Sequence, residues 1–257
     1  MKIVVCAKQV LALGDEVEFT DDGKDVDPDY LESALNEWDA CATEEALRIR
    51  ESAEQPDTVE VVVVTVGGED AEQALRRCLA MGADRAIRVE ADSEGFLDPI
   101  TVARALADPI RAEGADLVLS GVQSSDTVQA ATGTALAELL DLPRVAVVTE
   151  VDYKVGDSSA TVRRELEGGL VDVVEVDVPA LLTVQTGINE PRYANLRAIK
   201  QAANKELTVV SAASGESAAY TVRRMFHPPK GESTELIEGN PAEVAGRIVE
   251  IVREKLS

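Results

Sequence analysis

The chain has 257 residues and a formal net charge of −23 at pH 7, because 48 acidic residues outnumber 25 basic ones. Such an acidic chain is not expected to bind nucleic acid through a broad electrostatic surface or to adhere to an anionic membrane. The acidic residues are spread along the whole chain, as in proteins adapted to high salt, which screens their mutual repulsion. We therefore expect a halophilic source, such as an archaeon.

Hydrophobic residues make up 45% of the chain, but aromatic residues only 3%. The core must therefore be built from aliphatic side chains, which suits a parallel sheet buried on both faces. Cys6, Cys41 and Cys78 lack the paired spacing of a zinc site, and their odd number argues for a reducing compartment. No signal peptide precedes the first strand and no apolar run could span a membrane, so we expect a cytoplasmic protein.

Strands and helices alternate through the first 143 residues. Apolar runs predict strands at 2–10, 58–66, 85–89 and 117–119, and helical spacing predicts helices at 36–51, 69–81, 99–113 and 130–140. A polar excursion at 14–28 contains an Asp-Asp-Gly turn signal and could hold a hairpin. The alternation predicts an α/β fold with a doubly wound, mostly parallel sheet.

The pattern changes after residue 144. Three strand-like runs joined by short polar turns predict an antiparallel extension, at 145–154, 160–167 and 170–178. One more strand is expected at 181–185 and a short helix at 196–203. Beyond an extended arm with two consecutive prolines, residues 241–256 have the spacing of an amphipathic helix that docks on its own core or on another chain.

The segment 116–133 runs from a buried strand through a polar loop into a helix. Free N–H groups at a helix N-terminus bind anions, Gly121 would let the backbone come close to a ligand, and the Ser and Thr hydroxyls could donate to phosphate or ribose oxygens. The alternative is that these polar residues only cap the helix. Ligands bind at the carboxyl ends of strands in a doubly wound sheet. We therefore expect the turns after Val10, Val66 and Ser120 to meet around one ligand.

Residues 187–205 form a second candidate site. The sequence Asn189-Glu190-Pro191 interrupts regular structure, and Arg192, Tyr193 and Leu196 are expected to be exposed. A surface that mixes Arg, Tyr and Leu suits a protein contact, whereas the alternative is a packed connector.

Signs of a self-contained catalytic centre are absent from the sequence. It has no Walker-type phosphate loop, no strict dinucleotide glycine fingerprint and no serine nucleophile elbow. His227 is the only histidine, which excludes a cluster of histidine ligands. A binding or carrier role is therefore favoured over an enzyme, and no metal site is expected.

Four segments carry a family resemblance. They are LTVQTGINEPRYANLRAIKQAANK at 182–205, LAMGADRAIRVE at 79–90, ELEGGL at 165–170 and VVCAKQV at 4–10. With these segments in this order, the sequence resembles the beta subunit of electron transfer flavoprotein over nearly its whole length.

The resemblance implies an electron carrier rather than an enzyme. In the family, the beta subunit forms a heterodimer with an alpha subunit that holds most of the FAD site. The beta subunit buries AMP in its own nucleotide-binding fold. Electrons come from acyl-CoA dehydrogenases of fatty acid oxidation and other flavin dehydrogenases, and pass to a quinone-linked oxidoreductase. Three domains follow from the resemblance: a nucleotide-binding α/β domain at 1–186, a partner-docking loop and helix at 187–205, and a C-terminal arm and helix at 206–257 that packs on the alpha subunit.

The resemblance also assigns residues to two sites. The AMP site falls on Cys6, Asn36, Glu37, Trp38, Asp39, Val66, Gly121, Val122, Gln123, Ser124, Ser125, Asp126, Thr127, Val128, Gln129, Ala130, Ala131 and Thr132. The partner-docking site falls on Asn189, Glu190, Pro191, Arg192, Tyr193 and Leu196, the last being the leucine that enters a dehydrogenase pocket.

Two alternatives stay open. Some family members hold a second FAD at the AMP position and bifurcate electrons from NADH, and the stretch from Asp126 to Gln129 matches neither version. The second alternative, from another class, is a free-standing adenine-nucleotide-binding sensor domain, although such a monomer needs neither a docking segment nor a long C-terminal arm.

Overall fold

A computed structural model describes residues 1–12, 17–27, 31–91, 97–212, 221–229 and 236–256. The chain divides into a large unit, residues 1–225, and a small unit, residues 226–257. The strands of the large unit are β1 (Lys2–Cys6), β2 (Gln9–Leu11), β3 (Ser33–Leu35), β4 (Glu60–Val66), β5 (Arg85–Glu90), β6 (Leu117–Gly121), β7 (Arg144–Asp152), β8 (Ser159–Glu165), β9 (Val171–Asp177), β10 (Ala180–Val184) and β11 (Leu207–Ser211). The α-helices are α1 (Glu37–Ser52), α2 (Glu72–Met81), α3 (Pro99–Glu113), α4 (Thr132–Leu140) and α5 (Leu196–Ala202), with α6 (Pro241–Leu256) in the small unit.

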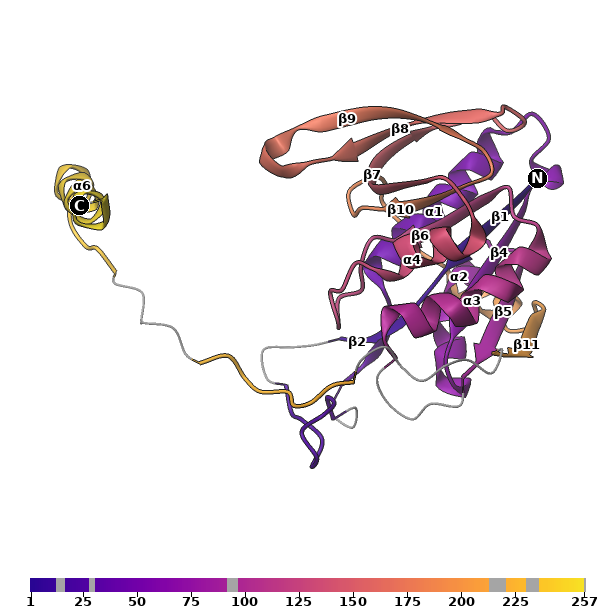
Figure 1. Cartoon of the computed structure of the whole chain (residues 1–257), viewed down its shortest axis with the longest axis horizontal. Coiled ribbons are helices and arrows are strands. Elements are labelled where there is room, and N and C mark those ends of the chain that lie inside the picture. Colours follow the sequence, from indigo (N-terminus) through magenta and orange to yellow (C-terminus); the bar gives the residue numbers. More distant parts are fainter. Residues whose placement is uncertain (13–16, 28–30, 92–96, 213–220, 230–235, 257) are drawn as a thin grey trace. The chain divides into compact units, whose positions relative to one another are not determined.

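One large sheet organises the described part of the large unit (Figure 1). Its strands lie in the order β11-β5-β4-β1-β6-β10-β7-β8-β9, and every pair from β11 to β7 is parallel. Side chains of successive strand residues point to opposite faces. Ile3 and Val5 therefore pack with α1 and α2, whereas Val4 packs with α3 and α4. The predicted doubly wound α/β fold is confirmed.

The winding reverses at β1. From β1 the chain builds outward through β4 and β5, and then returns through α3 to place β6 on the other side of β1. The helices before the return and those after it cover opposite faces of the sheet. A crevice at the carboxyl ends of β1 and β6 follows from this topology.

The antiparallel extension is confirmed. β8 pairs antiparallel with both β7 and β9. The strand expected at 181–185 is β10, which inserts between β6 and β7 and runs parallel to both. This placement pairs residues far apart in sequence, and the local pattern could not indicate it.

Short strands account for most differences from the predicted elements. The strand expected at 2–10 is divided in two: β1 ends at Cys6, and Gln9–Leu11 form β2, which pairs with β3 in a separate small sheet. β3 and β11 were not predicted. β11 pairs with β5 at an edge of the sheet, so the sheet reaches into the range that the sequence assigned to the arm. In the described part of the polar excursion, Phe19 and Val26 form an antiparallel bridge.

Helix boundaries follow the cap residues. α3 begins and ends where the sequence predicts, because the Asp98 carboxylate accepts the N–H groups of Ile100 and Thr101, and Gly114 is left-handed at the other end. α4 begins two residues later than expected, since Val128 and Ala130 have positive φ angles of 50°. Asn36 precedes α1 as expected, but its side chain does not cap the helix.

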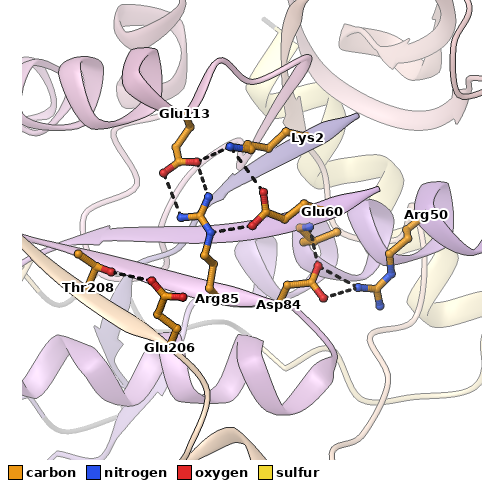
Figure 2. Close-up of polar contacts among 9 residues, drawn as sticks. Lys2, Arg50, Glu60, Asp84, Arg85, Glu113, Glu206 and Thr208 are labelled. Carbon is orange, nitrogen blue, oxygen red and sulfur yellow. Dashed lines mark hydrogen bonds and ion pairs between the residues drawn. The ribbon is translucent and has the colours of Figure 1, made fainter. Parts of the chain in front are cut away.

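A network of ion pairs lies at the amino ends of the strands (Figure 2). Glu113, at the end of α3, binds Arg85 through both carboxylate oxygens and accepts a 2.7 Å hydrogen bond from Lys2 Nζ. Arg85 also donates to Glu60 at 2.7 Å. The hydrogen bonds from Arg85 lower the pKa of Glu113 to about 2, against the opposing effect of burial. The first residues of β1, β4 and β5 are thereby joined to α3.

The small unit contains α6 as predicted. Asn240 Oδ1 accepts the Glu243 N–H at 3.1 Å, and Glu243 Oε2 accepts the Asn240 N–H at 3.0 Å, which is a capping box. Several apolar side chains of the helix are exposed, namely Ile248, Val249, Val252 and Leu256. None of the helices in the described ranges combines the length and apolarity needed to cross a bilayer.

Candidate nucleotide site

A cleft of about 630 Å³ opens at the carboxyl ends of β1, β4 and β6. Three turns line it: residues 7–11 after β1, residues 67–68 after β4, and the loop that begins at Val122 after β6. The turns expected after Val66 and Ser120 do meet here, whereas the segment that follows β1 lines the cleft from Ala7 onward rather than after Val10. The volume lies in the range of pockets that hold small molecules and cofactors.

Most of the predicted AMP-site residues line this cleft. They are Cys6, Asn36, Asp39, Val66, Gly121, Val122, Gln123, Ser124, Asp126, Thr127, Gln129, Ala130, Ala131 and Thr132. Four others, Glu37, Trp38, Ser125 and Val128, do not line it. The Trp38 Nε1–H donates to Gln185 Oε1 at 2.7 Å, which ties the indole ring to the residue after β10.

Sequence reasoning missed several lining residues. Those with polar side chains are Lys8, Thr20, Asp25, Ser33, Thr65 and Asp70. Gly67 and Gly68 lie in the turn that was expected after Val66, and they also line the cleft. The contribution of Thr20 and Asp25 could not be found, since it depends on how the polar excursion folds back over the cleft.

A buried carboxylate stands between the ends of β1 and β6. Asp39 is 6% exposed; its Oδ1 accepts the Gly121 N–H at 2.8 Å and its Oδ2 accepts the Lys8 N–H at 2.9 Å. Burial raises the pKa of Asp39 to about 6, although these hydrogen bonds oppose the shift. The charged form is thus held by backbone donors in a site that disfavours charge.

The absent side chain of Gly121 makes room for α1. A Cβ atom at Gly121 would lie 2.5 Å from Trp38 Cβ and 2.6 Å from Asp39 Oδ1. Gly121 also lines the cleft, so the expectation that its backbone comes close to a ligand stays a prediction. On the side where a Cβ would stand, the missing side chain lets the first turn of α1 reach the end of β6.

Polar contacts fix the loop between β6 and α4. The Asn36 Nδ2–H donates to Gln123 O at 2.8 Å, and Lys8 Nζ binds Asp126 Oδ1 at 2.7 Å. Burial alone would raise the pKa of Asp126, but Lys8 outweighs it and the pKa is lowered. The Ser124 and Thr127 hydroxyls lie 2.9 Å apart. The loop is a fixed wall, with its positive-φ residues just before α4.

The charges of the cleft restrict what it can hold. Among the lining residues that the structure describes, Lys8 is the single cation, and it is already paired with Asp126. Asp25, Asp39 and Asp70 add negative charge. An anion must therefore rely on backbone N–H groups, on hydroxyls such as that of Thr132, and on the N-terminus of α4. This balance disfavours a ligand with several phosphates.

The second candidate site rests on α1. Arg192 binds Glu44 at 2.7 and 2.9 Å and Glu51 at 2.6 and 3.0 Å, so only 33% of its side chain is exposed. The expectation that Arg192 is exposed is wrong. Asn189 Nδ2 donates to Cys41 O at 3.0 Å and to Glu45 Oε2 at 2.8 Å.

The apolar side chains of this segment point outward. Tyr193 is 87% exposed and Leu196 is 78% exposed, and Ile199 follows Leu196 one turn along α5. Burial of Glu44 would raise its pKa, but the hydrogen bonds from Arg192 lower it below its usual value. The segment therefore presents exposed apolar groups on an anchored backbone, which suits a protein contact.

Comparisons with known proteins agree along the whole chain. The electron transfer flavoprotein domain matches residues 26–214. The electron transfer flavoprotein subunit beta of Methylophilus methylotrophus is 48% identical over 99% of this chain and 98% of its own. The Syntrophomonas wolfei subunit beta is 34% identical over 97% and 95%. The caffeyl-CoA reductase–Etf complex subunit CarD of Acetobacterium woodii is 37% identical over 99% of each chain. The chain belongs to the beta subunits of the electron transfer flavoprotein family.

Proposed function

We propose that the chain is half of a heterodimeric electron carrier, with AMP in its cleft and FAD shared with an alpha subunit. FAD accepts electrons from acyl-CoA dehydrogenases or other flavin dehydrogenases and passes them to a quinone-linked oxidoreductase. The chain itself supplies binding surfaces and performs no bond chemistry. Its three cysteines are free and buried, in keeping with a reducing compartment such as the cytoplasm.

The cleft at the reversal of the winding is the observation that carries this proposal. It offers hydroxyls, backbone N–H groups and the N-terminus of α4, but one cation, already paired, among its described lining residues. That chemistry suits a ligand with a single phosphate, since each further phosphate would face the carboxylates of Asp25 and Asp70 without a compensating cation. AMP meets this requirement better than ATP or a dinucleotide.

One specific observation favours the bifurcating alternative. A relative of 37% identity over nearly the full length is a subunit of a caffeyl-CoA reductase–Etf complex. In this alternative a second FAD occupies the cleft and NADH is the donor. The diphosphate of FAD would bring a second phosphate charge into a cleft that already carries Asp126 and Asp70.

Nucleotide and flavin analysis of the purified two-subunit complex distinguishes these functions. One FAD and one AMP per heterodimer is the expected result. Two FAD molecules and no AMP per heterodimer would show the bifurcating form instead. A stable single subunit that binds ATP and no flavin would contradict both and favour a free-standing sensor.

Exchange of the exposed docking leucine tests the electron donor. Leu196→Ala should slow reduction of the FAD by an acyl-CoA dehydrogenase about tenfold or more, because a central apolar contact is lost, while the flavin content stays unchanged. Val209→Ala removes a half-exposed valine from β11 and is the matched control. Equal reduction rates for both variants and the unchanged protein would contradict docking through Leu196.

A further inference from the structure

Two backbone N–H groups face each other across the crevice between β1 and β6. β1 and β6 pair as far as Cys6 and Ser120. Beyond that point Ala7 donates to Val64 in β4, and Val122 donates to Val184 in β10, so the two chains diverge. The N–H groups of Lys8 and Gly121 are left without a strand partner at the crevice.

One carboxylate takes both donors. Its Oδ1 lies 2.8 Å from the Gly121 nitrogen and its Oδ2 lies 2.9 Å from the Lys8 nitrogen. We propose that Asp39 is a positioning residue, whose carboxylate joins the end of β1 to the end of β6 and so sets the separation of the cleft walls. This inference rests on the proposed nucleotide function and adds to it: Asp39 acts on the nucleotide through the backbone.

Both residues that Asp39 binds, Lys8 and Gly121, are connected to other residues that line the cleft. Lys8, held through its N–H, reaches with its side chain to Asp126 and to Ser124 Oγ at 3.3 Å. Gly121, held through its N–H, begins the loop to α4. A shift of either end therefore moves the loop that lines the cleft.

The carboxylate is kept at a cost to stability. The ordinary pKa of an aspartate lies below the folded-state value of about 6, so protonation of Asp39 stabilises the fold, and this contribution is lost as the pH rises through 6. A charge that the fold disfavours, at the edge of a cleft, indicates a functional role. Other titratable groups near Asp39 are Lys8, between β1 and β2, and the buried thiols of Cys6, Cys41 and Cys78, whose raised pKa values keep them neutral at pH 7.

An isosteric change tests the role of the charge. Asp39→Asn keeps the shape of the side chain. The amide oxygen can still accept one backbone N–H, but the NH₂ group faces the other N–H and cannot accept it. In the purified two-subunit complex freed of nucleotide, AMP should bind about tenfold more weakly to this variant at neutral pH. The difference from the unchanged protein should shrink as the pH falls below 6, since Asp39 is then protonated. The phosphate of AMP titrates in both proteins and cancels in this ratio.

A matched control lies at the other end of the same strand pair. Asp116 Oδ2 accepts the Lys2 N–H at 2.7 Å, which also joins β1 to the chain of β6, but at the amino ends of the strands. Asp116→Asn should leave AMP affinity within about twofold of the unchanged protein. AMP affinities within about twofold for Asp39→Asn as well would overturn the proposal.

Gly121→Ala is a second variant that tests the proposal if Asp39→Asn does not fold. The added Cβ would meet Trp38 and Asp39 and displace the carboxylate without removing its charge, so AMP should bind more weakly. Unchanged affinity would contradict the inference. If the unchanged complex binds no AMP, the proposed function fails first. Hydrogen–deuterium exchange then decides on Asp39 alone: faster exchange at residues 8 and 121 in Asp39→Asn supports the bridge, and equal exchange rejects it.

Discussion

At the scale of single residues, Arg192 shows how an exposed-looking side chain becomes an anchor. Its guanidinium binds two carboxylates of α1, and one of them, Glu44, is almost fully buried. A guanidinium matches carboxylate geometry through paired N–H groups, which lysine cannot do. Its neighbour Tyr193 is thereby left free to face outward.

Removal of Arg192 should destabilise the protein. Arg192→Ala leaves the Glu44 charge buried without its main partner, and the free energy of unfolding should fall by roughly 2 kcal/mol. Arg197→Ala, an exposed arginine of the same segment, should change it by less than about 0.5 kcal/mol. Urea unfolding at neutral pH measures both. Equal effects of the two substitutions would show that the contacts with Glu44 and Glu51 add nothing.

At the scale of elements, the ion-pair network in Figure 2 locks α3 onto the amino ends of three strands. Glu113 is its centre. Because its folded-state pKa is about 2 and its ordinary value is 4.5, its contribution to stability is fully present above pH 4.5 and is lost as the pH falls toward 2.

Glu113→Gln should therefore lower the free energy of unfolding at neutral pH by about 3 kcal/mol. The difference from the unchanged protein should disappear in acid, where Glu113 is protonated. Glu206→Gln is the control, since Glu206 is exposed and accepts only from Thr208 among the contacts drawn in Figure 2. A deficit of Glu113→Gln that persists undiminished to pH 2 would point to packing rather than charge.

Elements with their own start and stop signals were predictable from sequence. α3 has Asp98, Pro99 and Gly114 at its ends, and α6 has its capping box, so both bounds were correct. β11 is short and pairs with β5 across a long stretch of chain, so nothing local marks it. The candidate site divides in the same way. The polar loop after β6 was visible as a motif, whereas the roles of Lys8 and Asp39 depend on strand ends that meet only in the folded sheet.

At the scale of the whole molecule, the net charge of −23 sets the response to salt. Self-repulsion of a like-charged surface opposes folding and is screened by added ions. The melting temperature should therefore rise between low and molar potassium chloride. Sucrose at matched osmolality tests for exclusion effects without ionic screening. A melting temperature that falls with salt would contradict both the screening argument and a halophilic source.

The place of β10 between β6 and β7 governs the order in which the sheet can be completed during synthesis. β6 is made early, yet one of its edges has no neighbour until residue 184 leaves the ribosome. For that interval the nascent chain carries an open edge of Leu117, Val118 and Leu119, the kind of surface that recruits wrong partners. One edge of β7 also remains unpaired until β10 is made, although its other edge can already pair with β8. One late strand thus closes the sheet at both neighbours together.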